Sequence, residues 1–468
     1  MDPLDSLRAL LPEGGVSTHP GEVAARSSDL WALAMLREAR GDTLDRALAV
    51  AFPRTTEHVS SVMLWAQETG TPVVPRGGGS GVVGGAQAVR GAVVLDVSEM
   101  RNVIGIDEVS QAVEVQAGIR GDRLEAALGE VGLTVGHYPQ SLAISSVGGW
   151  IAAGSAGDAS TDGAIGDLVL GLAAVLADGR VVRLRAVPRS AAGPDLRRLF
   201  VGSEGTLGVI TEATLSATRL PGKMRWVAAA PAGFPEGVAA VREAIQQDLR
   251  PLVMRLSDPA DAGRTFGALD HSGGSVLLAG FARSRDADAS AMRELVGSTG
   301  AGGLSDEYGA HWWEHRFEAV DLYRGIMGPD RSLGSGVVAD TVEVAALWSR
   351  LPELHAAVDA ALRSRAEAVA CHLSHPSRSG ASLSFSFVVR GADDRAAGDA
   401  HLRAWRQAAQ ACHAAGGTIS HHQGVGLLKA PFMEDELGRP GLETLRAVKD
   451  ALDPAGILNP GKLIPGGG

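Results

Sequence analysis

The chain has 468 residues, of which 45% are hydrophobic and 21% charged, and this composition predicts a soluble globular protein of two or three domains. Its formal net charge of −11 argues against nucleic acid and anionic membrane surfaces as partners, and no apolar run reaches the roughly 20 residues of a membrane-spanning helix. The two cysteines, Cys371 and Cys412, form no C-x-x-C pair, and acidic residues stand where a secretion signal carries basic ones, so we predict a cytoplasmic protein.

Residues 1–53 predict an N-terminal helical segment. Leucines recur there at helical spacing, and Ser28 and Asp29 can cap a helix that stops near Gly41. Another helix begins after Thr55 and is expected to bury four large apolar side chains. These are Val59, Val62, Met63 and Trp65. A short apolar run at residues 72–75 then predicts a buried strand.

A glycine-rich loop follows this strand and reads RGGGSGVVGG from Arg76 to Gly85. Glycine adopts backbone angles closed to other residues, so successive N–H groups can line one concavity and hold a phosphate or pyrophosphate. The string from Gly79 to Gly84 also satisfies G-x-G-x-x-G, the dinucleotide fingerprint. No amphipathic helix opens at Gly84, and Asp96 is too close to be the required acidic residue, so the Rossmann interpretation fails. A merely flexible loop is the remaining alternative.

The stretch from residue 92 to residue 222 predicts strands, one helix and two further glycine-rich regions. A β meander covers 92–120 with Asp107 in a turn, and a helix begins near Gly121. One face of that helix carries Leu124, Ala127, Leu128 and Val131. The second glycine-rich region begins at residue 136 and leads into a hairpin that turns at Asp178-Gly179. The third region, LFVGSEGTLGVIT, ends in a strand.

The segments PRGGGSG, SSVGGWIAAGSAG and GSEGTLGVIT, in this order, resemble the FAD-binding domain of the vanillyl-alcohol oxidase (PCMH-type) superfamily. The tail string DPAGILNPGKLIP resembles the C-terminal signature of FAD-linked 2-hydroxyacid dehydrogenases and alkyldihydroxyacetonephosphate synthases. The resemblance implies an α+β fold with an FAD-binding domain at 54–222 and a C-terminal segment at 416–468 that returns to it. Between them, residues 223–415 alternate strands and helices, which predicts an α+β cap domain with an antiparallel sheet covered by helices.

The resemblance also implies which residues bind FAD. Arg76 to Gly81 would hold the pyrophosphate, residues 139–141 and 145–149 would line the isoalloxazine and phosphates, and residues 155–157 and 204–210 would wrap the ribityl and adenine end. The residues predicted to bind the cofactor are Pro75, Arg76, Gly77, Gly78, Gly79, Ser80, Gly81, Pro139, Gln140, Ser141, Ser145, Ser146, Val147, Gly148, Gly149, Ser155, Ala156, Gly157, Glu204, Gly205, Thr206, Gly208, Val209 and Ile210. Many relatives tether the flavin through a histidine in the first loop or a cysteine in the second, and this chain has neither there, so non-covalent FAD is expected.

Most of the chain is similar to alkyldihydroxyacetonephosphate synthase and its bacterial relatives. The strings that carry this similarity include HWWEHRFEAVDLYRG, CHLSHPSRSGASLSF and ISHHQGVG. In the synthase pattern, a histidine cluster sits at the flavin and an arginine grips the substrate phosphate. The resemblance therefore makes His421 and His422 the candidate bases and Arg324 the candidate anchor for an anionic group. Because the two histidines are adjacent, at most one of them is expected to touch the substrate.

The chain departs from the synthase pattern at three positions. Gln423 replaces the third histidine, and Ser377 and Ser384 stand where tyrosines are expected. A serine cannot readily replace a phenol, whose pKa lies near 10, as a general acid–base, so the synthase reaction itself is in doubt.

Two further histidines and two lysines are not assigned a role in catalysis. A metal site with His372 and His375 is conceivable, but no acidic ligand lies nearby in the sequence, and no metal is predicted. Lys429 and Lys462 are expected to be solvated.

Three functions remain open from the sequence. The main hypothesis is an FAD-dependent oxidoreductase that oxidises a small to medium, anionic hydroxy-type substrate by hydride transfer to flavin N5. The second is a non-redox transferase that uses a flavin adduct, and the third is a flavin-binding protein that has lost catalysis. The electron acceptor, which is oxygen, a quinone or a protein, is not determined, and a homodimer is expected from base rates.

Overall fold

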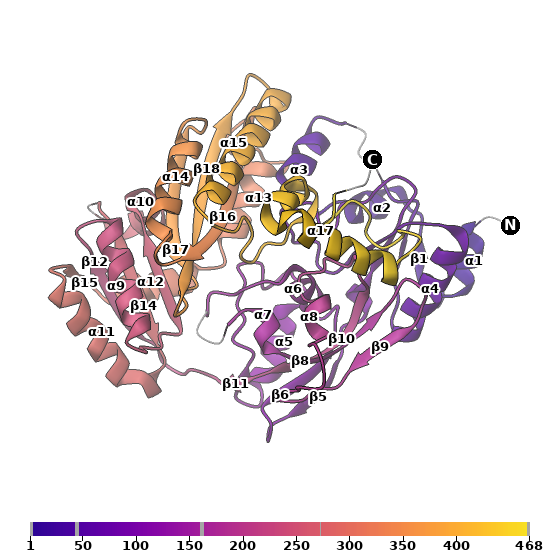
Figure 1. Cartoon of the computed structure of the whole chain (residues 1–468), viewed down its shortest axis with the longest axis horizontal. Helices are drawn as coiled ribbons and strands as arrows, with labels where there is room; N and C mark the ends of the chain where they lie inside the picture. The colour runs from indigo at the N-terminus through magenta and orange to yellow at the C-terminus, as the bar shows by residue number, and fades with distance from the viewer. Residues whose placement is uncertain (1–2, 43–45, 160–162, 272, 466–468) are drawn as a thin grey trace.

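The structure is a computed structural model that describes residues 3–42, 46–159, 163–271 and 273–465 (Figure 1). Two parts lie side by side in it. We call residues 3–222 together with 416–465 the loop domain, because the three glycine-rich loops belong to it, and we call residues 223–415 the cap. The C-terminal helix α17, Met433–Leu452, lies across the loop domain, and the chain after it forms a bridge from Leu458 to Val73.

The first sheet of the loop domain is mixed and has the order β1-β2-β4-β3. Its strands are Val16–Ser17 (β1), Ala49–Ala51 (β2), Val73–Arg76 (β3) and Val93–Asp96 (β4). Strands β2, β4 and β3 run parallel, so β3 delivers the first glycine loop at its carboxyl end. Helix α4, Thr56–Thr69, precedes β3; Thr55 caps it by accepting the His58 N–H, and Gly70 ends it in the left-handed conformation.

The second sheet is antiparallel and has the order β5-β6-β10-β8-β9. Its strands are Val103–Asp107 (β5), Ala112–Gln116 (β6), Val169–Val175 (β8), Val181–Leu184 (β9) and Val209–Ser216 (β10). A short pair joins β7, Leu133–Thr134, to β11, Thr218–Arg219. The remaining helices of the loop domain are Pro3–Ala9 (α1), Pro20–Arg26 (α2), Ala32–Ala39 (α3), Gly121–Gly129 (α5), Val147–Ala153 (α6), Ile165–Leu168 (α7), Arg197–Phe200 (α8) and Gly426–Lys429 (α16).

The cap is built on one antiparallel sheet with the order β15-β12-β14-β13-β17-β18-β16. Its strands are Arg225–Ala230 (β12), Val253–Ser257 (β13), Val276–Phe281 (β14), Gly302–Leu304 (β15), Val337–Leu347 (β16), Ala368–Ser374 (β17) and Gly380–Arg390 (β18). Its helices are Phe234–Gln246 (α9), Pro259–Phe266 (α10), Asp286–Ser298 (α11), Glu307–His315 (α12), Ala319–Met327 (α13), Leu351–Arg363 (α14) and Asp394–Ala414 (α15). The prediction of an antiparallel cap sheet with helices packed on it is confirmed.

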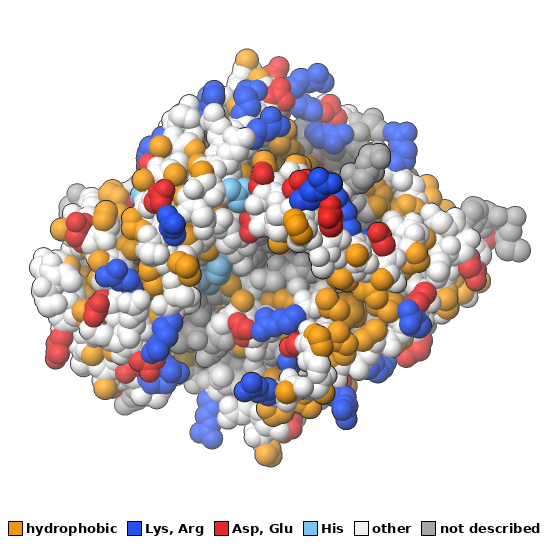
Figure 2. Space-filling model, in the orientation of Figure 1, with side chains coloured by type: hydrophobic (Ala, Val, Ile, Leu, Met, Phe, Trp, Pro, Cys, Tyr) orange, Lys and Arg blue, Asp and Glu red, His pale blue; other side chains and the backbone are white. Residues whose placement is uncertain are grey.

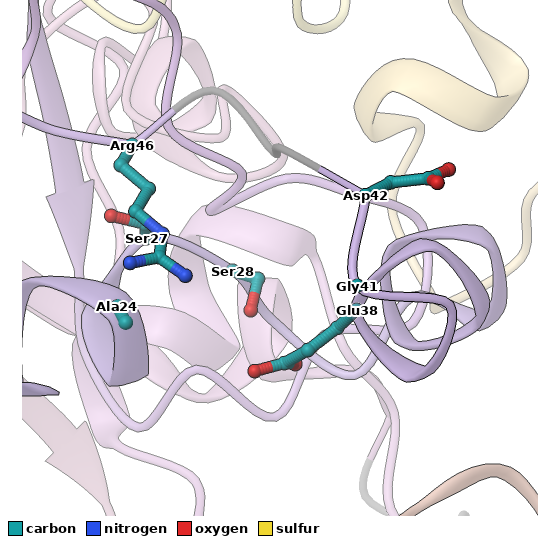
Figure 3. A pocket seen from close by; sticks show the side chains of 7 residues that line it. All are labelled: Ala24, Ser27, Ser28, Glu38, Gly41, Asp42 and Arg46. Atoms are coloured by element: carbon teal, nitrogen blue, oxygen red, sulfur yellow. The ribbon is translucent and has the colours of Figure 1, made fainter.

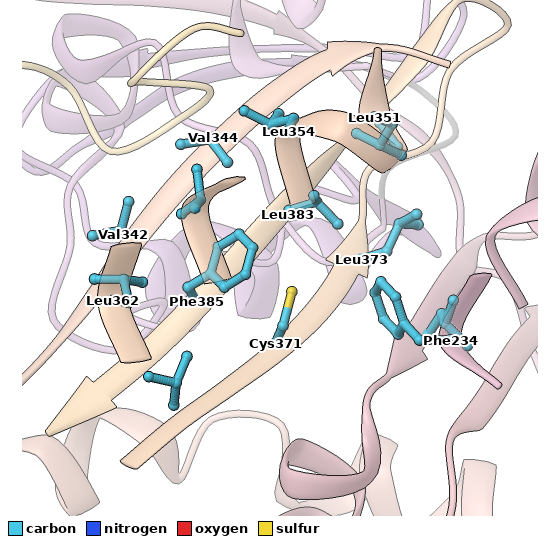
Figure 4. Close-up of a cluster of buried hydrophobic side chains, with 14 of the residues drawn as sticks. Phe234, Val342, Val344, Leu351, Leu354, Leu362, Cys371, Leu373, Leu383 and Phe385 are labelled. Atoms are coloured by element: carbon cyan, nitrogen blue, oxygen red, sulfur yellow. The ribbon is translucent and has the colours of Figure 1, made fainter. Parts of the chain in front are cut away.

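The hydrophobic core of the cap lies between this sheet and its helices (Figure 4). Leu354 and Leu362 of α14 face the side chains of β16 and β18, among them Val344 and Phe385. All of these side chains are buried, and the free cysteine Cys371 is buried among them. The core holds β16, β17 and β18 rigidly, and these strands carry cap residues that face the loop domain.

The predicted elements agree with the structure in most places. The hairpin turns at Asp178-Gly179, and the Asp107 carboxylate accepts the N–H groups of Val109 and Ser110 in the predicted turn. Val131 is an error, because it follows the end of α5 and is 38% exposed. The N-terminal segment is also not purely helical, since it contributes β1 and β2 to the first sheet. Within the described residues, no helix has both the length and the apolar character needed to cross a membrane.

Candidate active site

A cavity of about 1440 Å³ lies between the glycine loops and the cap. Drug-sized ligands occupy about 300–1,000 Å³, so this space is large enough for a cofactor and a substrate together. Figure 2 shows pale blue histidine side chains in the hollow where the two parts meet. Nearly all of the predicted cofactor residues line the cavity. Only Val147, Gly157 and Thr206 are not on its wall.

The first loop packs its backbone directly against the second. A Cβ atom on Gly77 would lie 2.0 Å from Ser146 Oγ, and one on Gly78 would lie 1.9 Å from the Ile144 carbonyl oxygen. Contacts this short are not tolerated, so both positions require glycine. The close approach leaves a groove of backbone groups that no side chain fills, as a flat or phosphate-bearing ligand requires.

Arg76 anchors the first loop. One of its terminal nitrogens donates to the Asp96 carboxylate at 3.2 Å, and Asp96 also pairs with Arg26. The Arg76 Nε is buried and has no hydrogen-bond partner among the described residues. Burial lowers the pKa of Arg76, and Asp96 opposes that change. The orphaned Nε of a buried cation beside a glycine cradle fits a ligand with a phosphate or pyrophosphate group.

The second and third loops are fixed by their own side chains. Ser146 Oγ accepts the Gly149 N–H at the start of α6, and Trp150 donates its indole N–H to Ser145 Oγ at 2.7 Å. In the third loop, Glu204 has a positive φ of 51° and its carboxylate accepts the N–H groups of Val425 and Gly426. Glu204 therefore ties the C-terminal segment to the cavity wall, and burial raises its pKa.

Three histidines gather where the cap meets the C-terminal segment of the loop domain. Nitrogen atoms of His375, His421 and His422 all lie within 4.8 Å of one another. His375 follows β17 at a positive φ of 49° and donates from Nε2 to the Gly157 carbonyl at 3.1 Å. His422 and His375 line the cavity, whereas His421 lies behind the wall. Three imidazoles at this spacing also suit a metal ion, so the absence of a metal stays a prediction.

Glu343 organises this histidine pair from the neighbouring strand β16. Its fully buried carboxylate accepts the backbone N–H groups of His421, His422 and Gln423, and it also contacts His422 Nδ1 at 3.0 Å and Lys429 Nζ at 3.4 Å. Burial raises the pKa of Glu343, but His422 and Lys429 outweigh it and hold that pKa well below its usual range. Because the ionised carboxylate can only accept, His422 Nδ1 carries the hydrogen in this contact, and Nε2 is the other ring nitrogen.

The other two histidines of the cluster, His421 and His375, have pKa values below that of an ordinary histidine. Burial and, to a lesser extent, His422 lower the pKa of His421 to about 4, although Glu343 opposes both. Burial and the two other histidines hold the pKa of His375 well below its ordinary value. Both rings are neutral at physiological pH, so they can accept or relay a proton without carrying a permanent charge.

Arginines of the cap also line the cavity. Arg255 of β13 and Arg264 of α10 both donate to the buried Asp261 carboxylate, at 2.8 and 2.7 Å. His372 Nδ1 lies 3.9 Å from the same carboxylate, so the expectation that no acidic group is close to His372 is wrong. Burial holds the pKa of His372 well below its ordinary value.

Arg316, which follows α12, lines the cavity and, like Arg76, has a nitrogen without a partner among the described residues. Its guanidinium lies over the Trp313 ring at 3.7 Å and the Phe317 ring at 4.2 Å, and its Nε is buried without a partner among the described residues. Arg324, the predicted anchor, is exposed on α13 and does not line the cavity, whereas Tyr323 on the same helix does.

Several functional candidates were not apparent from the sequence. Glu343, Arg255 and Arg316 received no role from the sequence; the fold brings Arg255 and Arg316 to the cavity wall and Glu343 to the histidine pair behind it. Lys429 and Lys462 were expected in solvent, but both are buried, with exposures of 0% and 1%. Burial lowers the pKa of Lys462 to about 8, and its Nζ has no partner among the described residues.

A second, much smaller pocket lies beside α2 and α3 (Figure 3). Its volume is about 90 Å³, and Glu38 and Arg46 approach it from opposite sides. This volume holds a few water molecules and no larger ligand.

Comparisons with known proteins agree with this site. A model of the FAD binding domain matches residues 47–185, and a model of the C-terminal domain of FAD linked oxidases matches residues 220–463. The chain belongs to the FAD-linked oxidase family. This FAD-linked oxidase is 31% identical over 445 residues to the FAD-linked oxidoreductase YgcU of Escherichia coli (strain K12), which covers 90% of each chain. It is 30% identical over 480 residues to alkyldihydroxyacetonephosphate synthase of Trypanosoma brucei brucei, covering 93% of this chain and 75% of that protein.

Solved structures show the same fold. Alkyldihydroxyacetonephosphate synthase superimposes with a TM-score of 0.82 at 21% identity, covering 99% of this chain and 86% of that one. p-Cresol methylhydroxylase superimposes with a TM-score of 0.80 at 17% identity, covering 99% and 96%. The predicted PCMH-type fold, the FAD cofactor and the assignment as an FAD-dependent oxidoreductase are therefore confirmed. Gly77, Gly78 and the orphaned nitrogen of Arg76 would hold FAD along the glycine loops.

Proposed function

We propose that this FAD-linked oxidase oxidises a hydroxyl-bearing substrate of small to medium size that carries an anionic group. The observation that carries the proposal is the His422–Glu343 pair, whose histidine lines the same cavity as the glycine loops, Arg255 and Arg316. When bound, FAD supplies the two-electron chemistry by accepting hydride at N5. The protein's own residues then have three tasks, which are to hold the anion, orient the hydroxyl and accept its proton.

His422 is proposed to accept the hydroxyl proton. Its Nδ1 is committed to Glu343, so Nε2 is the nitrogen left to act as the base. Glu343 fixes the tautomer and stabilises the imidazolium that forms, as a carboxylate behind a catalytic histidine does in other enzymes. His421, which does not line the cavity, acts as a positioning neighbour through its contact with His422 Nδ1 at 3.0 Å.

Arg316 is proposed as the anchor for the anionic group, in place of the exposed Arg324. Its planar guanidinium is held by aromatic rings and can bind a carboxylate or phosphate with two hydrogen bonds. Relatives whose names state a substrate favour a 2-hydroxy acid. Glycolate oxidase subunit GlcD of Bacillus subtilis (strain 168) is 27% identical over 431 residues, and a probable D-lactate dehydrogenase of Danio rerio is 28% identical over 434.

A second candidate function is a non-redox transferase of the alkyldihydroxyacetonephosphate synthase type. The similarity to that synthase over 93% of this chain, together with the His421-His422 pair, favours it. Gln423, Ser377 and Ser384 oppose it, because the phenol groups expected for proton transfer are absent. The assignment as an oxidoreductase argues against the third hypothesis, a protein that binds FAD without catalysis. A homodimer stays a prediction from the sequence.

The test is anaerobic mixing of the FAD-loaded protein with glycolate, lactate and larger 2-hydroxy acids while the visible flavin band is recorded. The proposal expects bleaching by at least one hydroxy acid, and slower bleaching by about 10²–10⁴-fold in His422→Ala, the range of general base catalysis. His19→Ala, an exposed histidine far from the cavity, is the matched control. Flavin that stays oxidised with every hydroxy acid while an acyl group is exchanged would favour the transferase.

A further inference from the structure

Asp158 occupies a position in the cavity that the proposed chemistry has not used. It follows α6 in the second glycine loop and lines the cavity. Its Oδ2 is shielded from solvent and has no hydrogen-bond partner among the described residues. The backbone on both sides is fixed, because Asp158 N–H donates to the Tyr138 carbonyl at 3.0 Å and the Gly157 carbonyl accepts from His375. The carboxylate is thus held at the wall without an internal partner.

The charges around Asp158 come from three separate elements. Burial raises the pKa of Asp158, and Arg255 of β13, Arg316 after α12 and His422 oppose that change, so the net pKa is about 6. The carboxylate is therefore ionised at neutral pH. A buried carboxylate oxygen without a hydrogen bond is unfavourable unless a ligand supplies the donor.

Arg316 also has a buried polar atom without a partner among the described residues, but in this case the atom is a donor. Its Nε is buried and unpaired, although its guanidinium faces the same cavity as Asp158. The attraction between the two groups does not amount to a hydrogen bond, since neither orphaned atom has the other as a partner. In the described part of the chain, the cavity wall therefore carries an unpaired donor, the Arg316 Nε, and an unpaired acceptor, the Asp158 Oδ2. A molecule with an anionic group and a hydroxyl group would supply a partner to each.

We propose that Asp158 is a specificity-determining residue that accepts the hydrogen bond of the substrate's hydroxyl group in the bound complex, before that proton passes to His422 in the oxidation, while Arg316 holds the anionic group. The assignment rests on the proposed function and deepens it, because it makes the hydroxyl, and not only the negative charge, a condition for binding. An anion that lacks the hydroxyl leaves the carboxylate unpaired beside another negative charge. A site built to bind a hydroxyl rejects such an analogue strongly, and we expect a preference of about tenfold to hundredfold for the hydroxy acid.

The experiment measures binding and not turnover. The FAD-loaded protein is titrated anaerobically with glycolate and acetate, and with lactate and propionate, and dissociation constants are taken from perturbation of the flavin spectrum, or from calorimetry if the hydroxy acid reduces the flavin. The ratio within each pair is compared in the wild type, Asp158→Asn, Asp158→Ala and the exposed control Asp399→Asn on α15. Flavin content is measured for each variant, so a folding defect is recognised.

The proposal expects the wild type and Asp399→Asn to prefer the hydroxy acid, and Asp158→Ala to bind both members of a pair with similar affinity. Asp158→Asn should bind acetate and propionate more tightly than the wild type, because a negative charge is removed beside the anion. A purely structural role would weaken both ligands alike. An unchanged preference in both Asp158 variants would overturn the proposal while leaving oxidation intact. A preference that depends on Asp158 without any bleaching would refute oxidation alone, and no binding of either pair would overturn both.

Discussion

Replacing Glu343 with glutamine should damage stability and activity by two separable routes. The change keeps the shape of the side chain but removes the charge that accepts three backbone N–H groups and contacts His422 and Lys429. Lys429 is 0% exposed, so the variant leaves an uncompensated buried ammonium group. Removing one partner of a buried ion pair costs about 3–5 kcal/mol, and we expect a loss of that size in the free energy of unfolding.

The double variant Glu343→Gln/Lys429→Met separates the two routes. It removes the orphaned charge, so much of the lost stability should return. The flavin reduction rate should stay low, by about 10–100-fold, because glutamine does not fix the protonated Nδ1 of His422 as a carboxylate does. Urea unfolding and anaerobic flavin reduction give the two readouts, with the exposed Glu114→Gln as control. A single variant that retains both stability and rate would refute the role given to Glu343.

Further predictions concern the loops, the cofactor and pH. Gly78→Ala should lower the FAD content after gel filtration by more than tenfold, because its Cβ would lie 1.9 Å from the Ile144 carbonyl oxygen. The control Gly105→Ala, whose Cβ would meet open space, should retain FAD. Equal FAD contents in the two variants would contradict the close packing of the loops. Acid precipitation should release yellow FAD into the supernatant, and flavin in the pellet would reveal a covalent link. The pKa of Glu343 lies well below its ordinary value of 4.5, so its stabilisation is complete above about pH 4.5 and lost as pH falls through the folded pKa. The wild type should therefore lose more unfolding free energy than Glu343→Gln in that acidic range, and parallel pH curves would contradict this.

Much of the cofactor side of the site could be predicted because short, contiguous glycine-rich segments form it. A glycine at 77 or 78 is required by backbone contact, and a run of such positions is visible without a structure. The antiparallel cap sheet could also be predicted, since its strands and helices alternate with clear apolar periodicity. Val131 was misplaced because α5 ends before it, and helix ends are the least certain part of such predictions.

The substrate side was harder to predict for a physical reason. Glu343 and Lys429 are single charged residues in apolar surroundings, and a sequence does not tell whether such a residue faces water or a partner 86 positions away. Arg316 follows α12 and Arg324 lies on α13, and their spacing in the sequence did not decide which one lines the cavity. Asp158 carried no signal, because its importance comes from missing a partner in the folded chain.

The central claim is that hydride leaves the substrate in a net two-electron oxidation assisted by His422. The most direct measurement is an anaerobic titration that counts the flavin reduced and the oxo acid formed for each hydroxy acid added. The account predicts one reduced flavin for each oxo acid produced, and a slower reaction in His422→Ala. Conversion of the substrate while the flavin ends fully oxidised and no oxo acid accumulates would contradict it.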